Sequence, residues 1–185
     1  MKAHDMWQDI QQVLLDEETL QNRVAEMAET LTQDYADKDL LMVGVLKGAV
    51  VFFSQLALRM KIPVSMDFIS VSSYGASSES SGVVRILKDL DTDITGKDVL
   101  LVEDIVDTGL TLTYLKEILQ TRQPASLKIA SLLDKPSRRK VELTPDYCGF
   151  YIPDVFVVGW GLDYNGNYRN LPVVGELKKE VYECD

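Results

Sequence analysis

The sequence predicts an α/β protein with a Rossmann-like parallel sheet flanked by helices. Apolar runs of strand length alternate along the chain with segments of helical periodicity, an order typical of right-handed parallel sheets. Most runs are apolar at nearly every position, as expected of strands covered on both faces. Polar segments follow four strands at their carboxyl ends, where open α/β sheets bind ligands: LKG, EDIVDTGLT, DKPSRR and WGLDYNGNYR.

The first half of the chain is expected to form a helix and then a strand–helix–strand unit. A cap at Asp16 or Thr19 begins a helix that runs to about Tyr35, because apolar side chains recur on one of its faces. The unit that follows consists of a doubly buried strand at residues 40–46, a helix at 48–60 and a strand at 63–71.

The second half is expected to add four strands and one helix. After the Ser/Gly-rich segment SSYGASSESSG, residues 83–90 alternate enough to form a strand with one wet face. The remaining elements are apolar strands at 99–102, 127–134 and 155–160, and a helix at about 110–122. Periodicity alone leaves the order of the strands in the sheet open.

The composition argues against several classes of function. The net charge of −10, from 29 acidic against 19 basic residues, works against non-specific binding to nucleic acid or anionic membranes. The apolar runs are shorter than the ~20 residues that span a bilayer. The N-terminus MKAHDMWQDI has no secretory apolar core, so we expect a cytoplasmic protein. With His4 as the single histidine, zinc sites and Ser-His or Cys-His nucleophiles are hard to build.

The stretch VLLVEDIVDTGLT, residues 99–111, is the strongest functional signal in the chain. It passes from a strand into a helix, so that several backbone N–H groups face outward together at the positive end of the helix dipole. Gly109 lets a ligand approach the backbone, and the hydroxyls of Thr108 and Thr111 add donors. The stretch therefore predicts a monophosphate site, and its spacing does not match the P-loop of triphosphate hydrolases.

Acidic side chains precede this phosphate site. Glu103 and Asp104 are acceptors suited to a diol or to a hydrated magnesium ion, so a sugar phosphate would fit both parts of the stretch. In the alternative interpretation, Asp107 is only a helix N-cap and the other two acids are solvated loop residues.

Several other residues are ordinary when each is considered alone. A lysine at a strand end is usually solvated, and apolar residues in a strand are usually core. The residues concerned are Lys47 at a strand end, Lys135 in a basic loop, Phe156 and Val157 in an apolar run, and Asp163 and Arg169 in a Gly/Asn-containing loop.

Together these segments resemble the type I phosphoribosyltransferases. VLLVEDIVDTGLT is similar to the phosphoribosyl pyrophosphate signature of that family, and the rest of the chain resembles the bacterial hypoxanthine (hypoxanthine-guanine) phosphoribosyltransferases. Two positions differ from many relatives, Trp160, where tyrosine is common, and Leu110, where some have lysine. The similarity runs from about Leu40 to Pro172 and includes LKG (46–48), SSYG (72–75), LLDKPSRR (132–139) and IPDVFVVGWGLDYNGNYRNLP (152–172).

The resemblance implies magnesium-dependent transfer of a 5-phosphoribosyl group from phosphoribosyl pyrophosphate to a 6-oxopurine, in purine salvage. Asp107 would handle the purine proton as the catalytic residue, and Glu103, Asp104 and Asp163 would bind Mg²⁺. The positions that match the phosphoribosyl pyrophosphate site are Lys47, Gly48, Glu103, Asp104, Asp107, Thr108, Gly109, Leu110, Thr111 and Arg169.

The resemblance also implies a purine site and a lid. Lys135 would contact the exocyclic oxygen of the base, Phe156 would stack on its ring, and the main chain of Val157 would contact the ring edge, with Asp163 nearby. Ser73 and Tyr74 would close over the reacting centre in a flexible lid loop. The Leu-Lys-Gly loop of such enzymes often contains a non-proline cis peptide.

The expected architecture is a single domain over residues 1–185, with a core at about 36–165 and a small hood from about 1–16 and 166–185. Assembly into a homodimer or homotetramer is expected, with no nucleic-acid or membrane partner. One rival is a regulator of this fold that binds a nucleotide or RNA without catalysis, and another is an adenine or pyrimidine transferase. The acidic composition argues against RNA, and the sequence does not rank hypoxanthine, guanine and xanthine.

Overall fold

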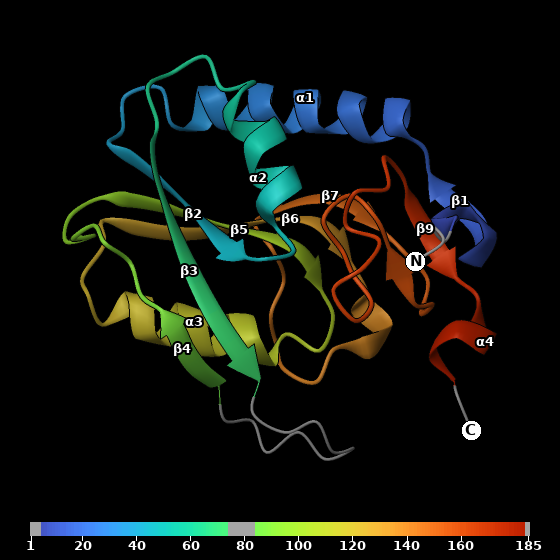
Figure 1. The fold of residues 1–185 in the computed structure, drawn as a ribbon. Helices are drawn as coiled ribbons and strands as arrows, with labels where there is room; N and C mark the ends of the chain where they lie inside the picture. Colours follow the sequence, from blue (N-terminus) through green and yellow to red (C-terminus); the bar gives the residue numbers. More distant parts are fainter. Residues whose placement is uncertain (1–4, 74–83, 184–185) are drawn as a thin grey trace.

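The computed structural model describes residues 5–73 and 84–183, and its main feature is a six-stranded sheet in the order β4-β3-β2-β5-β6-β7 (Figure 1). Neighbouring strands are parallel except β4, which runs antiparallel to β3. The predicted α/β class is therefore confirmed. The strands are β2 (Leu40–Leu46), β3 (Ser65–Ser73), β4 (Val84–Lys88), β5 (Asp98–Val106), β6 (Ser126–Asp134) and β7 (Tyr147–Tyr151).

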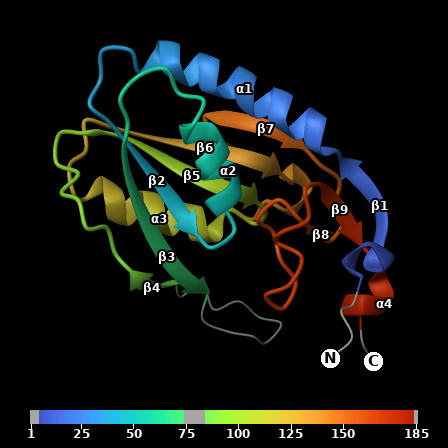
Figure 2. The same cartoon turned by 45° about the horizontal axis from the view of Figure 1, so that its top comes forward.

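Helices cover both faces of this sheet (Figure 2). The helices α1 (Glu17–Asp34) and α2 (Val50–Ala57) lie over one face, and α3 (Leu110–Gln120) lies over the other. Alternate side chains of β2 enter the two cores, with Leu40 and Met42 on the side of α1 and α2, and Leu41 and Val43 on the side of α3. Burial on both sides explains why the sequence of this strand is an unbroken apolar run.

The helix α1 begins and packs as its sequence predicts. Asp16 is the N-cap, and its side chain accepts a hydrogen bond from the backbone N–H of Thr19 at 2.8 Å. The expected apolar face is buried against the sheet and consists of Leu20, Val24, Met27, Ala28 and Leu31.

A smaller, three-stranded sheet joins segments from both ends of the chain. The strand β1 (Ile10–Leu15) pairs antiparallel with β9 (Val174–Leu177), which also pairs with β8 (Val157–Val158). This small sheet lies beyond the carboxyl ends of the main parallel strands (Figure 1). Short helices complete the described chain: η1 (Met6–Asp9), η2 (Pro136–Arg138) and α4 (Lys179–Tyr182).

The prediction of a main-sheet strand at residues 155–160 is wrong. Only β8 forms there, in the small sheet, because positive φ angles of 95° at Gly159, 50° at Trp160 and 105° at Gly161 turn the chain out of extended structure. The edge of the main sheet is instead β7, whose central Gly149 weakens the strand signal in its sequence.

The strand β5 is longer than predicted. It continues past Val102 to Val106, which pairs with Asp134 of β6, so Glu103 and Asp104 lie within the strand and not after it. Ladder hydrogen bonds use only backbone groups, and therefore the acidic side chains do not end the pairing. The carboxylates are consequently held on regular backbone.

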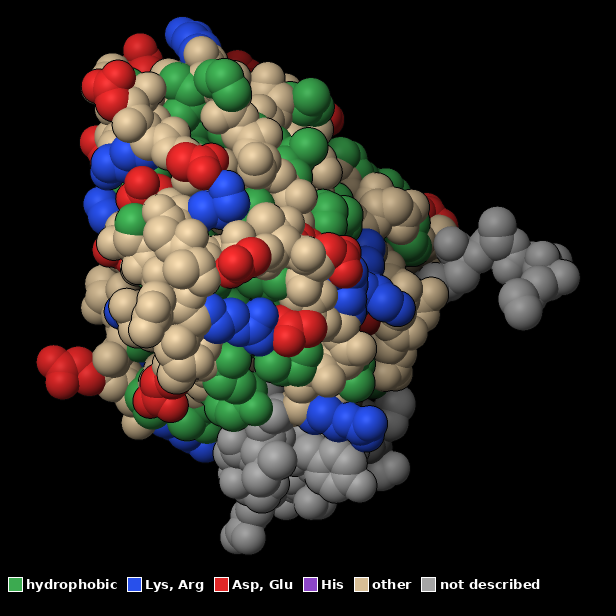
Figure 3. Space-filling model, turned by 90° about the vertical axis from the view of Figure 1, so that its left-hand side faces the viewer, with side chains coloured by type: hydrophobic (Ala, Val, Ile, Leu, Met, Phe, Trp, Pro, Cys, Tyr) green, Lys and Arg blue, Asp and Glu red, His purple; other side chains and the backbone are tan. Residues whose placement is uncertain are grey.

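On the face drawn in Figure 3, Lys and Arg side chains lie among Asp and Glu side chains. That face has no continuous basic area of the kind that binds nucleic acid. In the part of the chain that the structure describes, no helix has the length and hydropathy needed to cross a membrane.

Candidate active site

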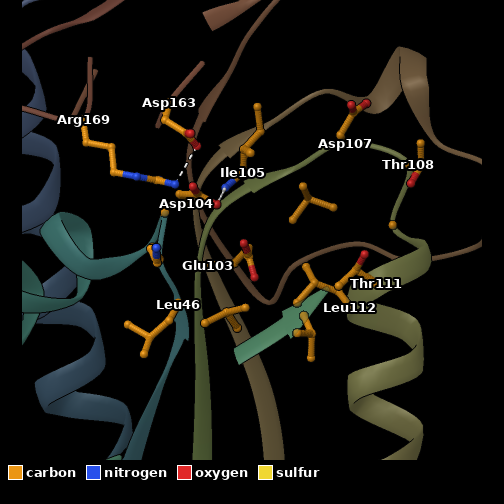
Figure 4. A pocket seen from close by; sticks show the side chains of 16 residues that line it. Leu46, Glu103, Asp104, Ile105, Asp107, Thr108, Thr111, Leu112, Asp163 and Arg169 are labelled. Carbon is orange, nitrogen blue, oxygen red and sulfur yellow. Dashed lines mark hydrogen bonds and ion pairs between the residues drawn. The ribbon is translucent and has the colours of Figure 1, made fainter. Parts of the chain in front are cut away.

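A cleft of about 330 Å³ opens at the carboxyl ends of β2 and β5. Figure 4 shows Asp163, Asp104 and Arg169 on one side of it and Thr108 and Thr111 on the other. The predicted residues that line it are Lys47, Gly48, Glu103, Asp104, Asp107, Thr108, Gly109, Thr111, Asp163 and Arg169. Segments far apart in the sequence thus meet at one edge of the sheet, as parallel strand order requires.

The turn between β5 and α3 forms the side of the cleft suited to phosphate. Gly109 is the N-cap of α3 and has a φ of 83°, a conformation that favours glycine. A Cβ on Gly109 would lie 2.9 Å from Cγ2 of Val141, so space also excludes a side chain. Thr108 and Thr111 face the cleft, whereas Leu110 does not line it.

Glu103 and Asp104 form an acidic pair at the floor of the cleft. Burial and the neighbouring Asp104 carboxylate raise the pKa of Glu103 well above its usual value, and burial also raises the pKa of Asp104. The Oε2 atom of Glu103 is buried and has no hydrogen-bond partner in the described structure. A buried oxygen of this kind is suited to a donor or a cation supplied by a ligand.

The loop after β2 contacts this acidic pair. The Leu46–Lys47 peptide is cis, which confirms the expectation for the Leu-Lys-Gly loop. A Cβ on Gly48 would lie only 1.6 Å from Oδ2 of Asp104, so glycine is needed for the loop to approach the carboxylate. The close approach brings Lys47 and the acids to the same cleft.

Asp163 and Arg169 come from the segment between β8 and β9. They form an ion pair at 2.6 Å, and Arg169 also donates to the carbonyl of Gly161 at 2.5 Å. Asp163 accepts a further hydrogen bond from the N–H of Gly166 at 2.7 Å. These contacts hold a carboxylate and a guanidinium at the rim of the cleft.

A second cavity of about 510 Å³ adjoins the first. Its lining includes Lys135, Phe156 and Val157, as predicted for the purine site. Burial lowers the pKa of Lys135, whose Nζ donates to the carbonyl of Val155 at 2.6 Å. Ile105, Asp107 and Asp163 line both cavities, so a ligand in one can meet a ligand in the other at these residues.

Sequence reasoning missed several residues of the second cavity. Ile105 lies between Asp104 and Val106 in the signature, beyond the strand predicted at 99–102, and was given no role in the site. Arg138 is half-exposed, and its Nε donates to Oδ1 of Asp107 at 3.2 Å. Tyr182 stacks on Phe156 with ring centroids 4.8 Å apart. The role of Ile105 could have been inferred from its place in the signature. Nothing in the sequence brings Arg138 to Asp107, or Tyr182 to Phe156 across 26 residues.

The predicted lid cannot be placed. Ser73 ends β3, and Tyr74 lies outside the described residues together with the rest of 74–83. The lid function of this segment therefore stays a prediction.

The fold and the site together define an α/β protein with a cleft suited to a phosphate and a neighbouring cavity with an aromatic wall. The sequence matches the phosphoribosyl transferase domain family over residues 11–165. The chain therefore belongs to the phosphoribosyltransferase family.

Within this family, the chain is most usefully compared with enzymes that transfer a phosphoribosyl group to hypoxanthine and guanine. The chain is 52% identical to the hypoxanthine-guanine phosphoribosyltransferase of Bacillus subtilis, over 96% of this chain and 99% of that protein. It is 51% identical to the enzyme of the same name from Staphylococcus aureus, with the same coverage. A crystal structure of a hypoxanthine phosphoribosyltransferase from Staphylococcus aureus matches with a TM-score of 0.95 and 49% identity, covering 100% of both chains.

Proposed function

We propose that this chain catalyses the transfer of a 5-phosphoribosyl group from phosphoribosyl pyrophosphate to hypoxanthine, and to guanine, giving the nucleotide and pyrophosphate. The reaction belongs to purine salvage. The observation that carries the proposal is the junction of the two cavities, because the residues common to both, Ile105, Asp107 and Asp163, mark where a sugar and a base would meet.

The first cavity suits phosphoribosyl pyrophosphate. The 5-phosphate of this substrate would bind the N–H groups and hydroxyls of the Thr108–Thr111 turn, at the positive end of the α3 dipole. Glu103 and Asp104 would accept hydrogen bonds from the ribose hydroxyls. Lys47 and Arg169 would bind the pyrophosphate, since both cations line the same cleft.

The acidic residues also fit a magnesium ion. No group of three or more ligand side chains converges in the described residues, which suits a cation that takes only one or two carboxylates and completes its shell with substrate oxygens and water. The candidate ligands are Glu103, Asp104 and Asp163, of which one or two would bind the ion directly, and the unpartnered Oε2 of Glu103 supports a place for it among them. Bound magnesium would stabilise the charge of the pyrophosphate leaving group.

The second cavity suits a 6-oxopurine. Lys135 can only donate hydrogen bonds, so its ammonium matches the exocyclic oxygen of hypoxanthine and opposes the amino group of adenine. Phe156 offers an aromatic face for stacking, and the main chain of Val157 lies beside it.

Asp107 would act on the base. It lines both cavities, so its carboxylate can hold or accept the ring proton of the purine while the ring nitrogen attacks the anomeric carbon. The sugar acquires positive charge as pyrophosphate leaves, and the surrounding carboxylates stabilise that charge. The bond from the anomeric carbon to pyrophosphate breaks as the bond to the purine forms.

The whole chain, residues 1–185, would work as one domain in which the small sheet forms a hood over the site. We also propose that it assembles into a homodimer or homotetramer in the cytoplasm. Light scattering after gel filtration would measure the number of subunits.

The function is tested by incubating the purified chain with phosphoribosyl pyrophosphate, Mg²⁺ and a panel of bases. We expect nucleotide formation with hypoxanthine and guanine, at least about tenfold less efficient use of adenine, and loss of turnover when a chelator removes the metal. Equal use of adenine would refute the role of Lys135. Tight nucleotide binding with no turnover for any base would show a regulator instead of an enzyme.

A further inference from the structure

The loop that follows β6 packs against the turn proposed to bind the 5-phosphate. Three consecutive carbonyl groups of this turn accept hydrogen bonds from that loop. The N–H of Lys135 donates to Val106 O at 2.9 Å, Arg139 Nη1 donates to Asp107 O at 2.5 Å, and the N–H of Lys140 donates to Thr108 O at 3.0 Å. The middle contact is the only one of the three made by a side chain.

These contacts fix the direction of the backbone donors. In a trans peptide, the carbonyl of one residue and the N–H of the next point in opposite directions. Carbonyls turned towards the 135–140 loop therefore turn the N–H groups of Asp107, Thr108 and Gly109 away from it. Because all three residues line the cleft, these donors become available to a ligand there.

Arg139 is itself held in place by burial and charge. Its side chain is 14% exposed, and its Nη2 forms an ion pair with Asp134, which is 2% exposed. The Cδ of Arg139 would lie 3.1 Å from a Cβ on Gly109, so its stem also packs against the turn. Arg138 differs, because its side chain is 49% exposed and contacts the Asp107 carboxylate instead of the backbone.

We propose that Arg139 is a positioning residue that orients the backbone donors of the 5-phosphate site. This positioning role deepens the proposed function and rests on it. Arg139 does not line either cavity, so it acts through the peptide that joins Asp107 to Thr108. The planar guanidinium can bind the Asp134 carboxylate and the Asp107 carbonyl at the same time, which a smaller cation does less well.

The test compares two ligands that occupy different parts of the cleft. Binding of ribose 5-phosphate depends on the donors that Arg139 orients, whereas pyrophosphate binding depends on Lys47 and Arg169. In the full chain with Mg²⁺, we expect Arg139→Ala to raise the Kd for ribose 5-phosphate by about tenfold and to leave that for pyrophosphate within about twofold, as measured by calorimetry. The KM for phosphoribosyl pyrophosphate should rise with the first Kd.

Three further variants complete the test. Arg139→Ala leaves the buried Asp134 carboxylate without its partner, so the variant Asp134→Asn/Arg139→Ala removes that charge and is used if the single variant does not fold. Arg139→Lys should recover part of the ribose 5-phosphate affinity. Arg122→Ala breaks an ion pair with Asp89 far from the cleft and serves as the control, with both Kd values unchanged.

The outcomes separate this inference from the proposed function. If the folded Arg139 variants bind ribose 5-phosphate as the wild type does, or lose both ligands equally, Arg139 does not orient these donors. Absence of transfer by the wild-type chain would refute the proposed function, while the comparison of the two Kd values would still decide the role of Arg139.

Discussion

Asp107 is the residue at which the two cavities meet. Its carboxylate faces the exposed guanidinium of Arg138 at 3.2 Å, and its carbonyl accepts a hydrogen bond from the partly buried Arg139. The backbone is therefore fixed from one side, while the side chain, 42% exposed, stays accessible to a base. The group that holds the Asp107 backbone in place is therefore different from the carboxylate that would act on the base.

Replacing Asp107 by asparagine should affect turnover without affecting the fold. Asparagine keeps the size and the backbone contacts but cannot accept a proton at neutral pH, so we expect kcat to fall by ~10²-fold or more. Stopped-time assays of nucleotide formation, with thermal unfolding as the check on folding, measure this. Turnover equal to that of the wild type would refute the assignment.

Glu103 illustrates a cost in stability at the site. Because burial raises its pKa, the folded protein loses stability as the pH rises above 4.5, the unperturbed value at which the unfolded chain begins to release the proton. Glu103→Gln should therefore stabilise the ligand-free protein at neutral pH by about 1 kcal/mol, or roughly 2–4 °C in Tm. The gain should disappear below pH 4.5.

Glu117→Gln, on the exposed side of α3, is the matched control for that change and should leave Tm unaltered. The stabilised Glu103→Gln variant should also bind phosphoribosyl pyrophosphate less well in the presence of Mg²⁺. A lower Tm at neutral pH would show that the carboxylate is not the destabilising group that its burial indicates.

Among the elements, those with a single strong pattern could be predicted from the sequence. The strand β2 is apolar throughout and α1 has both a cap and an apolar face, so both were placed nearly to the residue. Elements whose apolar pattern is interrupted by another feature could not be predicted in this way. Gly149 weakens β7, acidic side chains hide the end of β5, and positive φ angles at Gly159 and Trp160 interrupt β8.

The residues of the candidate site also differ in whether the sequence could predict them. Asp107 was predictable from its place after a strand, because parallel strands bring their ends together, whereas Lys47 became a candidate only through the family resemblance. From the sequence alone, Phe156 is expected only to be a core residue, and no pattern indicates Tyr182 as its stacking partner. Their contact depends on the fold bringing α4 against the segment that precedes β8, which no local pattern encodes.

The helix α4 is expected to support the purine cavity. Tyr182 stacks on Phe156 at an interplanar angle of 24°, so it fixes the ring proposed to contact the base. Tyr182→Ala should raise the KM for hypoxanthine by about two- to tenfold, with the KM for phosphoribosyl pyrophosphate unchanged, and Tyr182→Phe should restore it. A lower KM in the alanine variant would show that Tyr182 occupies the face that the purine needs.

In the whole molecule, the main sheet and the segment before β9 meet at two glycines. A Cβ on Gly161 would lie 2.2 Å from the carbonyl oxygen of Gly48, and Gly161 has a φ of 105°. The loop that carries Lys47 therefore packs directly on the segment that carries Asp163 and Arg169. Each half of the cleft depends on the position of the other.

Gly161→Ala should push the two segments apart. We expect a loss of stability of about 1–3 kcal/mol and a KM for phosphoribosyl pyrophosphate raised by about tenfold or more. Gly96→Ala is the control, because Gly96 also has a positive φ, 72°, but has nothing within 4 Å of the added Cβ. It should lose stability without losing affinity. Equal effects of the two variants on KM would argue against coupling between the segments.

The pairing of β1 with β9 also orders events during protein synthesis. The main sheet has all its strands once β7 has been made, and such units fold as they emerge from the ribosome. The small sheet forms later, because β1 is the first strand of the chain to be translated and its partner β9 is the last. Asp163 and Arg169 are translated late as well. A nascent chain stalled so that Tyr151 has just left the ribosome should therefore resist protease across its α/β core yet fail to retain phosphoribosyl pyrophosphate, because Asp163 and Arg169 are not yet available to the cleft.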